Sequence, residues 1–507
     1  MMGRLFGLVM AVLLLPAVAG GKAALAQAGF GDDRVMLQGF YWESFRHGHP
    51  DRFPQFGDKP WYRIVHEQAA AIREGRFDLV WLPPPSLAAV PPALSAGYNP
   101  KEYFTLDNSY GSSAEHRDML TALLSQGIEP VADIVINHRD GYAKWADFRN
   151  PSWGAWAITR DDSAFTNANS ELVGTSVADR GAPEEPVHYD TDVQTSFDYD
   201  GYRDLDHTDI RVRRDIVRYM LQLKSAGYRG WRYDMVHGYH ARWIALYNRA
   251  THPTFSVGEY DWSRHGAQRG WMWHSATEAN RLETASSVFD FAPFWTLKDN
   301  IGRYDAWYGG GRGLGKLGDT TDGHPWRNRA VTFIQNHDTG RRTLEDGTPE
   351  QHHDKDDFTD TWQIEQAYAY ILTHPGVPTV FWKHYFDRGE TLRERIRAMI
   401  NARKVAGVHA GSELHTQDNA RANGVYAARV DGRHGTLYVR VGGDDAKWQP
   451  QHSGYADYRE YAAGDGWKVW VGLPGNPETR QAPLAAPLPV PSYQDPADIA
   501  VADEQLK

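Results

Sequence analysis

The sequence predicts an α/β fold: a (β/α)8 barrel, or TIM barrel, with an excursion inserted after the third strand and a C-terminal antiparallel β domain. Three observations predict it. Short apolar runs alternate with amphipathic helical patterns, as in a parallel sheet. A long polar segment interrupts the alternation after the third run, and β-like runs without helices follow after about residue 407. A doubly wound open sheet is the alternative for the repeating part.

The N-terminal 26 residues have the pattern of a secretory signal peptide. Arg4 supplies the positive start, residues 5–18 are almost uninterruptedly apolar, and Ala24-Leu25-Ala26 fits a small-x-small cleavage site. A membrane anchor is the alternative, but the apolar run is short for a spanning helix. We therefore expect cleavage after Ala26 and a secreted protein, extracellular or periplasmic, with no membrane contact after removal of the signal.

Eight apolar runs are the candidate barrel strands. They cover residues 35–42, 77–82, 129–138, 230–236, 254–259, 287–291, 330–338 and 377–382. Two of the helices between them have readable ends. Ser113 precedes a helix with Met119, Leu120, Leu123 and Leu124 on one face, and Gly127 ends it. The second runs from Asp209 to Gly227 with a similar apolar period.

The remaining segments set the domain organisation. Residues 27–138 and 198–406 form the two parts of the barrel, and residues 139–197, rich in Gly, Asp and aromatics, form the inserted domain. Residues 407–474 contain short β-like runs and form the C-terminal domain. In residues 475–507, Pro and Ala dominate and large apolar residues are few, so a disordered tail or a linker remnant is expected.

Composition excludes several classes of function. With 54 basic and 65 acidic residues and no basic patch, the chain is not expected to bind nucleic acid. It has no cysteine, which rules out disulfides and thiol chemistry. Aromatic residues make up 13% of the chain, and they suit either a core or stacking on sugar rings. A monomer is expected.

Polar residues stand at the ends of four of the predicted strands. The third run ends in Asp133-Ile134-Val135-Ile136-Asn137-His138, the fourth in Arg232-Tyr233-Asp234, the fifth in Glu259 and the seventh in Asn336-His337-Asp338. In such barrels, catalytic residues come from the C-terminal ends of strands. Each group alone is more often a helix cap or an ion pair. Together they indicate a single active site at one rim.

These stretches resemble the motifs of the α-amylase family of glycoside hydrolases. D-I-V-I-N-H, G-W-R-Y-D-M-V-H-G, V-G-E and N-H-D match in order, and the Gly-Tyr-Asn-Pro stretch at 97–100 resembles the family's G-Y-x-P. Residues 204–206 resemble a further short motif, although Arg203 replaces its usual proline. The likeness covers roughly residues 35–471. Residues 288–292 and 366–378 resemble bacterial α-amylases and maltotetraose-forming exo-amylases.

The resemblance implies roles for individual residues. Asp234 matches the nucleophile, Glu259 the general acid/base, and Asp338 the third carboxylate, which binds hydroxyls of the distorted sugar. The expected substrate contacts are Tyr98, His138, Arg232, His237 and His337, with His237 standing where many members carry lysine. Three tryptophans could line the glucan cleft: Trp42, Trp153 and Trp262.

The position of Arg232 in an apolar strand has a chemical reason. Arg232 and Asp234 are two residues apart, so on a strand they face the same side. Arg232 is then expected to keep Asp234 ionised and oriented for attack. Glu259 must instead hold its proton near neutral pH, and we expect low solvation and the neighbouring carboxylates to raise its pKa.

The resemblance also implies a calcium ion, Ca2+, beside the nucleophile strand. Calcium prefers several oxygen ligands, and an ordinary acidic loop is the alternative. The expected ligands are Asn137, Asp198, Gly201, Asp204 and Gly238.

The expected function is retaining hydrolysis of internal α-1,4 bonds in starch and related glucans or maltooligosaccharides. One alternative is an exo-acting enzyme that releases a short maltooligosaccharide such as maltotetraose, or an α-glucan transglycosylase. Another is a non-catalytic glucan-binding protein. The presence of Asp234, Glu259 and Asp338 argues against this last alternative.

Overall fold

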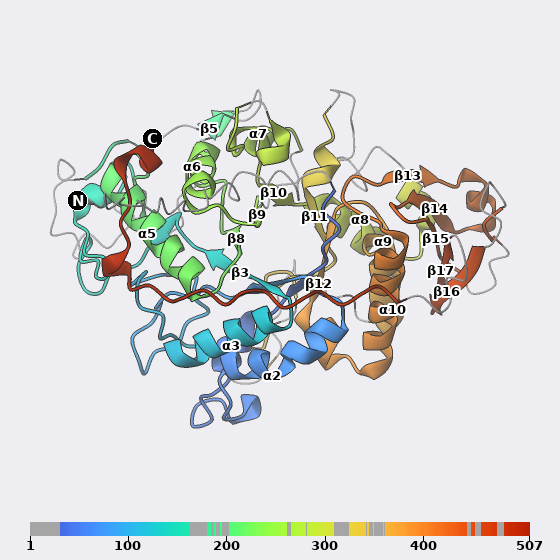
Figure 1. Cartoon of the computed structure of the whole chain (residues 1–507), viewed down its shortest axis with the longest axis horizontal. Helices are drawn as coiled ribbons and strands as arrows, with labels where there is room; N and C mark the ends of the chain where they lie inside the picture. Colours follow the sequence, from blue (N-terminus) through green and yellow to red (C-terminus); the bar gives the residue numbers. More distant parts are fainter. Residues whose placement is uncertain are drawn as a thin grey trace, which may run out of the picture.

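A computed structural model of the chain shows a barrel with a β domain beside it (Figure 1). It describes residues 31–162, 180–183, 187–188, 193–194, 202–260, 265–279, 281–308, 324–340, 342–343, 348, 358, 360–443, 448–451, 458–473 and 481–507. The predicted signal peptide, residues 1–26, lies outside the described residues, as do Asp198, Gly201 and Trp262.

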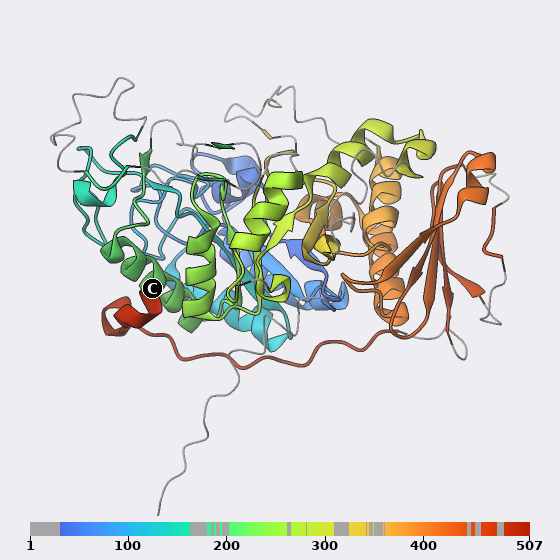
Figure 2. The same cartoon turned by 90° about the horizontal axis from the view of Figure 1, so that it is seen from above.

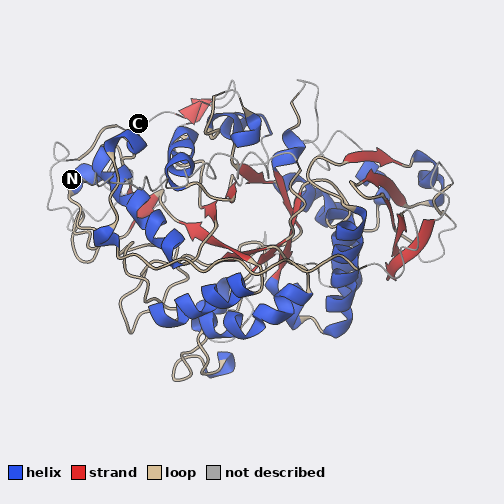
Figure 3. Ribbon diagram, viewed as in Figure 1, coloured by secondary structure: helices blue, strands red, loops and turns tan. Residues whose placement is uncertain are grey.

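The eight predicted strands form a closed parallel barrel, which confirms the expected fold (Figure 3). The strands are β1 (Met36–Gln38), β2 (Leu79–Leu82), β3 (Glu129–Ile134), β8 (Gly230–Tyr233), β9 (Phe255–Gly258), β10 (Ser287–Phe289), β11 (Ala330–Phe333) and β12 (Val377–Phe381). They neighbour one another in this order, and β12 closes on β1. All eight are shorter than the apolar runs that predicted them, because residues at the ends of the runs lie in the flanking loops.

Helices surround the barrel. They are α2 (Trp61–Glu74), α3 (Ser113–Ser125), α5 (Ile210–Ala226), α6 (Ala241–Thr251), α7 (His265–His274), α8 (Phe291–Asn300), α9 (Thr361–Ile371) and α10 (Glu390–Ala406). Short helical turns are η1 (Trp42–Arg46), η2 (Pro54–Phe56), η3 (Ala155–Ala157), η6 (Leu282–Thr284), η7 (Tyr304–Tyr308), η9 (Trp326–Arg329), η10 (Lys383–Asp387), η11 (Asp418–Asn423), η13 (Pro496–Asp498) and η14 (Asp503–Leu506). Among the described residues, no helix combines the length and apolar character that crossing a membrane requires.

The caps of α3 and α5 explain where these helices begin and end. Ser112, one residue before the predicted Ser113, forms a capping box: its Oγ accepts from the Glu115 N–H at 3.3 Å, and Glu115 accepts from the Ser112 N–H at 2.9 Å. Asp209 caps α5 through the Arg211 N–H at 2.8 Å. Gly227 follows α5 with φ of 134°, a backbone conformation that favours glycine.

The inserted segment joins the barrel through a short antiparallel pair. β4 (His138–Arg139) pairs with β7 (Arg203–Asp204), and β5 (Val187–His188) pairs with β6 (Val193–Gln194). Arg139 is fully buried, and its guanidinium lies 4.5 Å from the Trp153 ring centre. This contact places Trp153 in the packing of the inserted segment, where it is only 4% exposed.

The C-terminal domain is a five-stranded antiparallel sheet, as expected. Its strands are β13 (Glu413–Thr416), β14 (Tyr426–Asp431), β15 (Thr436–Val441), β16 (Tyr458–Gly464) and β17 (Trp467–Gly472), in the order β13-β14-β15-β17-β16. The sheet packs beside α9 and α10 (Figure 1). Buried Glu365 of α9 accepts a hydrogen bond from the Trp467 indole at 2.9 Å, which ties the two domains together.

The prediction of a disordered tail is wrong for residues 481–507. Figure 2 shows this segment in red, running from the C-terminal sheet along the barrel to the end marked C. The Leu488 N–H donates to the Leu124 carbonyl at 2.8 Å, and the Gln494 N–H to Ser225 Oγ at 2.9 Å. Ile499 and Leu506 are buried. The segment has no core of its own, and it is ordered because the helices of the barrel provide its partners. We call it the C-terminal strap.

Candidate active site

One buried guanidinium holds three carboxylates at the rim of the barrel. Arg232 Nη1 donates to Asp133 Oδ1 at 2.7 Å and to Asp234 Oδ1 at 2.6 Å, and its Nη2 lies 2.7 Å from Glu259 Oε2. The Arg232 side chain is completely buried, whereas those of Asp234 and Glu259 are 10% and 14% exposed. The predicted nucleophile and the predicted acid therefore lie side by side on the same cation.

Strand register produces this arrangement. Asp133 of β3 stands opposite Arg232 of β8, and Tyr233 of β8 stands opposite Gly258 of β9. Because the strands are parallel, the next residues, Asp234 and Glu259, leave the barrel at the same rim. The Glu259 N–H still donates to the Tyr233 carbonyl at 2.9 Å, which fixes the backbone at the start of the loop.

Burial sets the acidity of two of these groups. It raises the pKa of Asp234 to about 6, while Arg232 acts in the opposite direction. Burial likewise raises the pKa of Asp133 to about 6, against the same opposing cation. The spacing of Arg232 and Asp234 predicted only the ion pair and therefore a readily ionised Asp234. Desolvation is the larger effect, although a pKa of about 6 still leaves Asp234 mostly ionised at neutral pH.

Asp133, the first residue of the motif in the third run, has a role that the sequence did not reveal. Its Oδ2 accepts hydrogen bonds from the Trp81 indole at 3.0 Å and from the Tyr98 hydroxyl at 2.9 Å. It thus connects Arg232 to the aromatic residues of the rim. The available signal was an aspartate inside an otherwise apolar strand, because a completely buried carboxylate requires partners.

Tyr98 and His337 lie together with Trp42. The Tyr98 hydroxyl is 2.7 Å from His337 Nε2, and the two rings are stacked with centres 5.2 Å apart. His337 Nδ1 is 2.9 Å from the Gln38 amide nitrogen, and this contact orients the imidazole. The Trp42 ring is parallel to Tyr98 within 3°, at 5.8 Å. Two predicted sugar contacts thus share one aromatic cluster with a tryptophan.

Asp338 is the most open of the three predicted catalytic carboxylates. Its side chain is 41% exposed, with Oδ2 3.1 Å from His337 Nε2 and Oδ1 2.6 Å from Arg342 Nη2. Its exposure and its position after β11 suit a group that meets the substrate. The charge of Asp338 also contributes, after the larger effect of burial, to the raised pKa of Asp234.

His138 and His237 are more enclosed than sugar contacts need to be. His138 Nε2 lies 2.8 Å from the Tyr98 carbonyl, and burial lowers the pKa of His138 to about 4. His237 is 7% exposed, and its ring centre is 6.1 Å from that of Tyr260. Their roles as substrate contacts stay predictions.

The described part of the predicted calcium site offers oxygen ligands. Asn137 Oδ1 is buried and has no hydrogen-bond partner among the described residues. Asp204, opposite His138 in the β4–β7 pair, lines a small cavity of about 20 Å³ together with Gly238. The backbone brings the two residues near each other, because the Leu205 N–H donates to the Asn137 carbonyl at 3.0 Å. An orphaned amide oxygen and a carboxylate are ligands that calcium prefers, and these residues would hold the ion between the inserted segment and the barrel.

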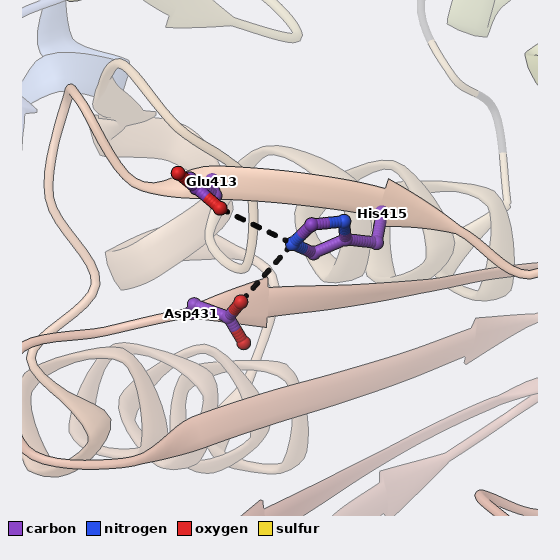
Figure 4. Close-up of side chains that lie close together, drawn as sticks. All are labelled: Glu413, His415 and Asp431. Atoms are coloured by element: carbon purple, nitrogen blue, oxygen red, sulfur yellow. Dashed lines mark hydrogen bonds and ion pairs between the residues drawn. The ribbon is translucent and has the colours of Figure 1, made fainter. Parts of the chain in front are cut away.

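A second cluster with metal-ligand chemistry lies in the C-terminal sheet (Figure 4). His415 Nε2 is 3.0 Å from Asp431 Oδ2 and 3.6 Å from Glu413 Oε2. Arg429 also lies 3.2 Å from the same Asp431 oxygen, so the carboxylate already has a cationic partner. Glu413 is 75% exposed. We assign the cluster as surface ion pairing on neighbouring strands.

Comparisons with known proteins agree with this geometry. The family described as "Alpha amylase, catalytic domain" matches residues 42–279, and "Alpha-amylase C-terminal beta-sheet domain" matches residues 405–471. The chain is 29% identical to "Probable alpha-amylase 2" of Arabidopsis thaliana over 450 residues, which cover 86% of this chain and 93% of that protein. It is 29% identical to "Glucan 1,4-alpha-maltotetraohydrolase" of Stutzerimonas stutzeri over 465 residues, covering 86% and 74%.

A solved structure supports the fold. The structure of an α-amylase from Geobacillus thermoleovorans in complex with acarbose matches with a TM-score of 0.60 and 14% identity, covering 88% of this chain and 99% of that one. The matched catalytic and C-terminal domains are those that the barrel and the five-stranded sheet form here. The chain therefore belongs to the α-amylase family and is an α-amylase-type glycoside hydrolase that acts on starch.

Proposed function

We propose that the enzyme cleaves internal α-1,4-glucosidic bonds of starch and related glucans with retention of the anomeric configuration. The observation that supports this best is the sharing of Arg232 by Asp234 and Glu259. Retaining glycosidases need two carboxyl groups about 5–5.5 Å apart, one as nucleophile and one as acid/base. Asp234 and Glu259 contact Nη1 and Nη2 of the same guanidinium, which holds the two carboxyl groups close together, as a retaining mechanism requires.

In the proposed reaction, an Asp234 oxygen attacks the anomeric carbon while the protonated Glu259 gives its proton to the glycosidic oxygen. The bond between that carbon and that oxygen breaks, and a glycosyl ester of Asp234 remains. Glu259, now ionised, takes a proton from water, whose oxygen displaces Asp234. Asp338 would hold hydroxyls of the distorted sugar, and Arg232 would orient the nucleophile throughout.

A second outcome of the same chemistry is the release of a fixed short maltooligosaccharide from chain ends. Two glucan 1,4-α-maltotetraohydrolases match the chain at 28–29% identity, about as closely as the plant α-amylase does. Transfer of the glycosyl unit to another sugar, in place of water, is a third outcome. The choice depends on the shape of the cleft beyond the reacting bond.

A time course of products from amylose tests these outcomes, with Glu259→Gln measured beside the parent enzyme. A ladder of many lengths at early times supports internal cleavage, one dominant short product supports exo action, and products longer than the substrate support transfer. Glu259→Gln should abolish hydrolysis while its melting temperature stays close to that of the parent. The exposed Glu278→Gln is the matched control and should keep full activity. An active Glu259→Gln enzyme would contradict the assignment.

We also propose that the protein is secreted and binds calcium. The signal pattern of residues 1–26 motivates the first proposal, and the oxygen ligands around Asn137 and Asp204 motivate the second. N-terminal sequencing of the mature protein should begin at Gln27. A mature chain that still begins at Met1 would contradict cleavage.

A further inference from the structure

Arg342 occupies a place in the catalytic rim that the reaction outlined above does not use. Its Nη2 lies 2.6 Å from Asp338 Oδ1, and its guanidinium carbon lies 3.5 Å from the centre of the Trp42 ring. The Arg342 side chain is 15% exposed, whereas that of Asp338 is 41% exposed. Arg342 is therefore enclosed between Trp42 and Asp338, and the Asp338 side chain is more exposed to solvent than that of Arg342.

The turn η1 fixes the backbone next to Arg342. Arg46 Nη1 donates to the Thr343 carbonyl at 2.6 Å, and the Thr343 N–H donates to Glu43 Oε1. Glu43 is almost completely buried, and its other oxygen lies 3.2 Å from Lys383 Nζ. Trp42, Glu43 and Arg46 thus contact residues 342–343 at three points. These contacts bind the segment after β1 to the segment after β11.

Arg342 holds one oxygen of Asp338. Its Nη2 donates to Oδ1 at 2.6 Å, and His337 Nε2, which also lies 2.7 Å from the Tyr98 hydroxyl, is 3.1 Å from Oδ2. An ionised carboxylate has about four acceptor sites, so it can keep the contact with Arg342 and still accept from hydroxyl groups of a sugar. Without the arginine, the carboxylate could rotate away from the direction that the substrate requires.

We propose that Arg342 is a positioning residue for hydrolysis, which holds Asp338 in the orientation that binds the distorted sugar, and that Trp42 keeps its guanidinium in place. This inference rests on the proposed role of Asp338. Arginine suits the task better than lysine, because its planar group stacks on an aromatic ring while it donates to a carboxylate. The residue acts through Asp338 and needs no contact with the substrate.

The first test is the kinetics of Arg342→Ala and Arg342→Lys on soluble starch. A misoriented group that acts in the transition state lowers kcat more than it weakens substrate binding. We expect Arg342→Ala to lower kcat by about 10- to 100-fold, the scale of a misplacement of about 1 Å, with a smaller change in KM. Arg342→Lys keeps the charge and loses the planar contact, so its kcat should fall between those of the parent and the alanine variant.

A double-mutant cycle separates positioning from a general structural effect. An aryl maltoside with a good leaving group makes the residual activity of Asp338→Asn measurable. If Arg342 acts through Asp338, adding Arg342→Ala to Asp338→Asn should lower kcat/KM less than about twofold further, since coupled residues are not additive. The surface variant Arg63→Ala, which breaks the exposed ion pair with Glu67, is the matched control and should leave all kinetic constants unchanged.

Two results would overturn the inference. One is an Arg342→Ala enzyme with the parent kcat, and the other is an equal loss in the parent and in the Asp338→Asn background. Melting temperatures identify any variant that has lost its fold, and Arg342→Lys then carries the test. Activity in Glu259→Gln would instead contradict the proposed function itself, so the two failures can be told apart.

Discussion

Arg232 shows how a single residue organises the site. A buried cation without partners is strongly unfavourable, and here three carboxylates surround it. The contact with Asp234 was predictable from the sequence, because residues two apart on a strand share a face. The contact with Asp133 was not, since it depends on the pairing of β3 with β8, which are far apart in sequence. Sequence patterns within one strand predict contacts within that strand, whereas contacts between strands depend on how the strands pair.

The acidity of Asp234 predicts the pH dependence of the enzyme. Because the proposed nucleophile Asp234 must be ionised to attack, and burial raises its pKa to about 6, kcat/KM should fall as the pH decreases below about 6. Steady-state rates on a soluble maltooligosaccharide from pH 4 to 8 measure this. An acid limb centred near the ordinary value for aspartate, below pH 5, would contradict the prediction.

Protonation of Asp234 should not unfold the protein, so unfolding through this group does not explain the expected loss of activity at low pH. A carboxyl whose pKa is higher in the folded state than in the unfolded state binds its proton more tightly when folded. Between about pH 6 and the unfolded value, protonation of Asp234 therefore stabilises the fold as the pH decreases. Melting temperatures recorded in the same buffers provide the control, because other groups also contribute to stability.

At the scale of elements, the strands were the most predictable feature and their ends the least. All eight apolar runs became strands, because a strand buried on both faces is apolar throughout. The run at residues 330–338 became only β11 (Ala330–Phe333), since Asn336 and its neighbours turn back on themselves. The Asn336 side chain accepts from the Asp338 and Thr339 N–H groups, both at 2.9 Å. Such turns follow from side-chain chemistry that apolar periodicity does not reveal.

Gly258, the last residue of β9, shows why a glycine precedes Glu259. A Cβ atom at this position would lie 2.3 Å from the Trp271 ring of α7, so only glycine lets the helix and the strand approach this closely. Gly258→Ala should destabilise the fold by about 1–3 kcal/mol through overpacking. It should also lower kcat, because Glu259 is the next residue. Urea unfolding and starch hydrolysis measure the two effects.

A second substitution checks that explanation. Trp271→Leu removes the ring that Gly258→Ala meets, so the double variant should recover part of the kcat that Gly258→Ala loses. Trp271→Leu alone should lose stability, because it leaves a cavity in the core. Strictly additive losses in the double variant would show that the ring contact is not the cause.

The proposed calcium site next to the β4–β7 pair predicts how the protein responds to a chelator. An ion bound only by the folded state stabilises it, so chelation should lower the melting temperature. The orphaned Oδ1 of Asn137 would be one ligand, and Asn137→Ala should therefore show a smaller shift on chelation than the parent. Asn300→Ala, at the end of α8, should keep the full shift. No shift in the parent under strong chelation would count against the site.

At the scale of the whole molecule, the C-terminal strap was the least predictable part. Its Pro- and Ala-rich composition contains too few large apolar residues for a core, and this composition predicted a disordered tail or a linker remnant. The structure shows that order can come entirely from partners elsewhere in the chain. Leu124, Ser225 and Arg218 belong to α3 and α5, more than 250 residues before the strap positions they contact. No local pattern carries that information.

The route of the strap predicts that it affects stability and not catalysis. It binds the Leu124 carbonyl and the Ser225 side chain, which lie at the C-terminal ends of α3 and α5. In a (β/α)8 barrel these helix ends lie at the face opposite the catalytic rim, where residues contribute to stability. Deleting residues 481–507 should lower the apparent melting temperature, while kcat on starch at 25 °C changes by less than about twofold.

Single substitutions locate the effect within the strap. Leu506 is 1% exposed and Leu484 is 44% exposed, so the two leucines form a matched pair. Leu506→Ala should destabilise the protein by about 2–5 kcal/mol, the range for truncating a buried leucine, and Leu484→Ala should have little effect. Thermal denaturation of both variants beside the truncated chain makes the comparison. If the buried side chains of the strap stabilise the protein, only Leu506→Ala should lower the melting temperature. Equal melting temperatures for Leu506→Ala and Leu484→Ala would therefore mean that the strap lies on the barrel without stabilising it.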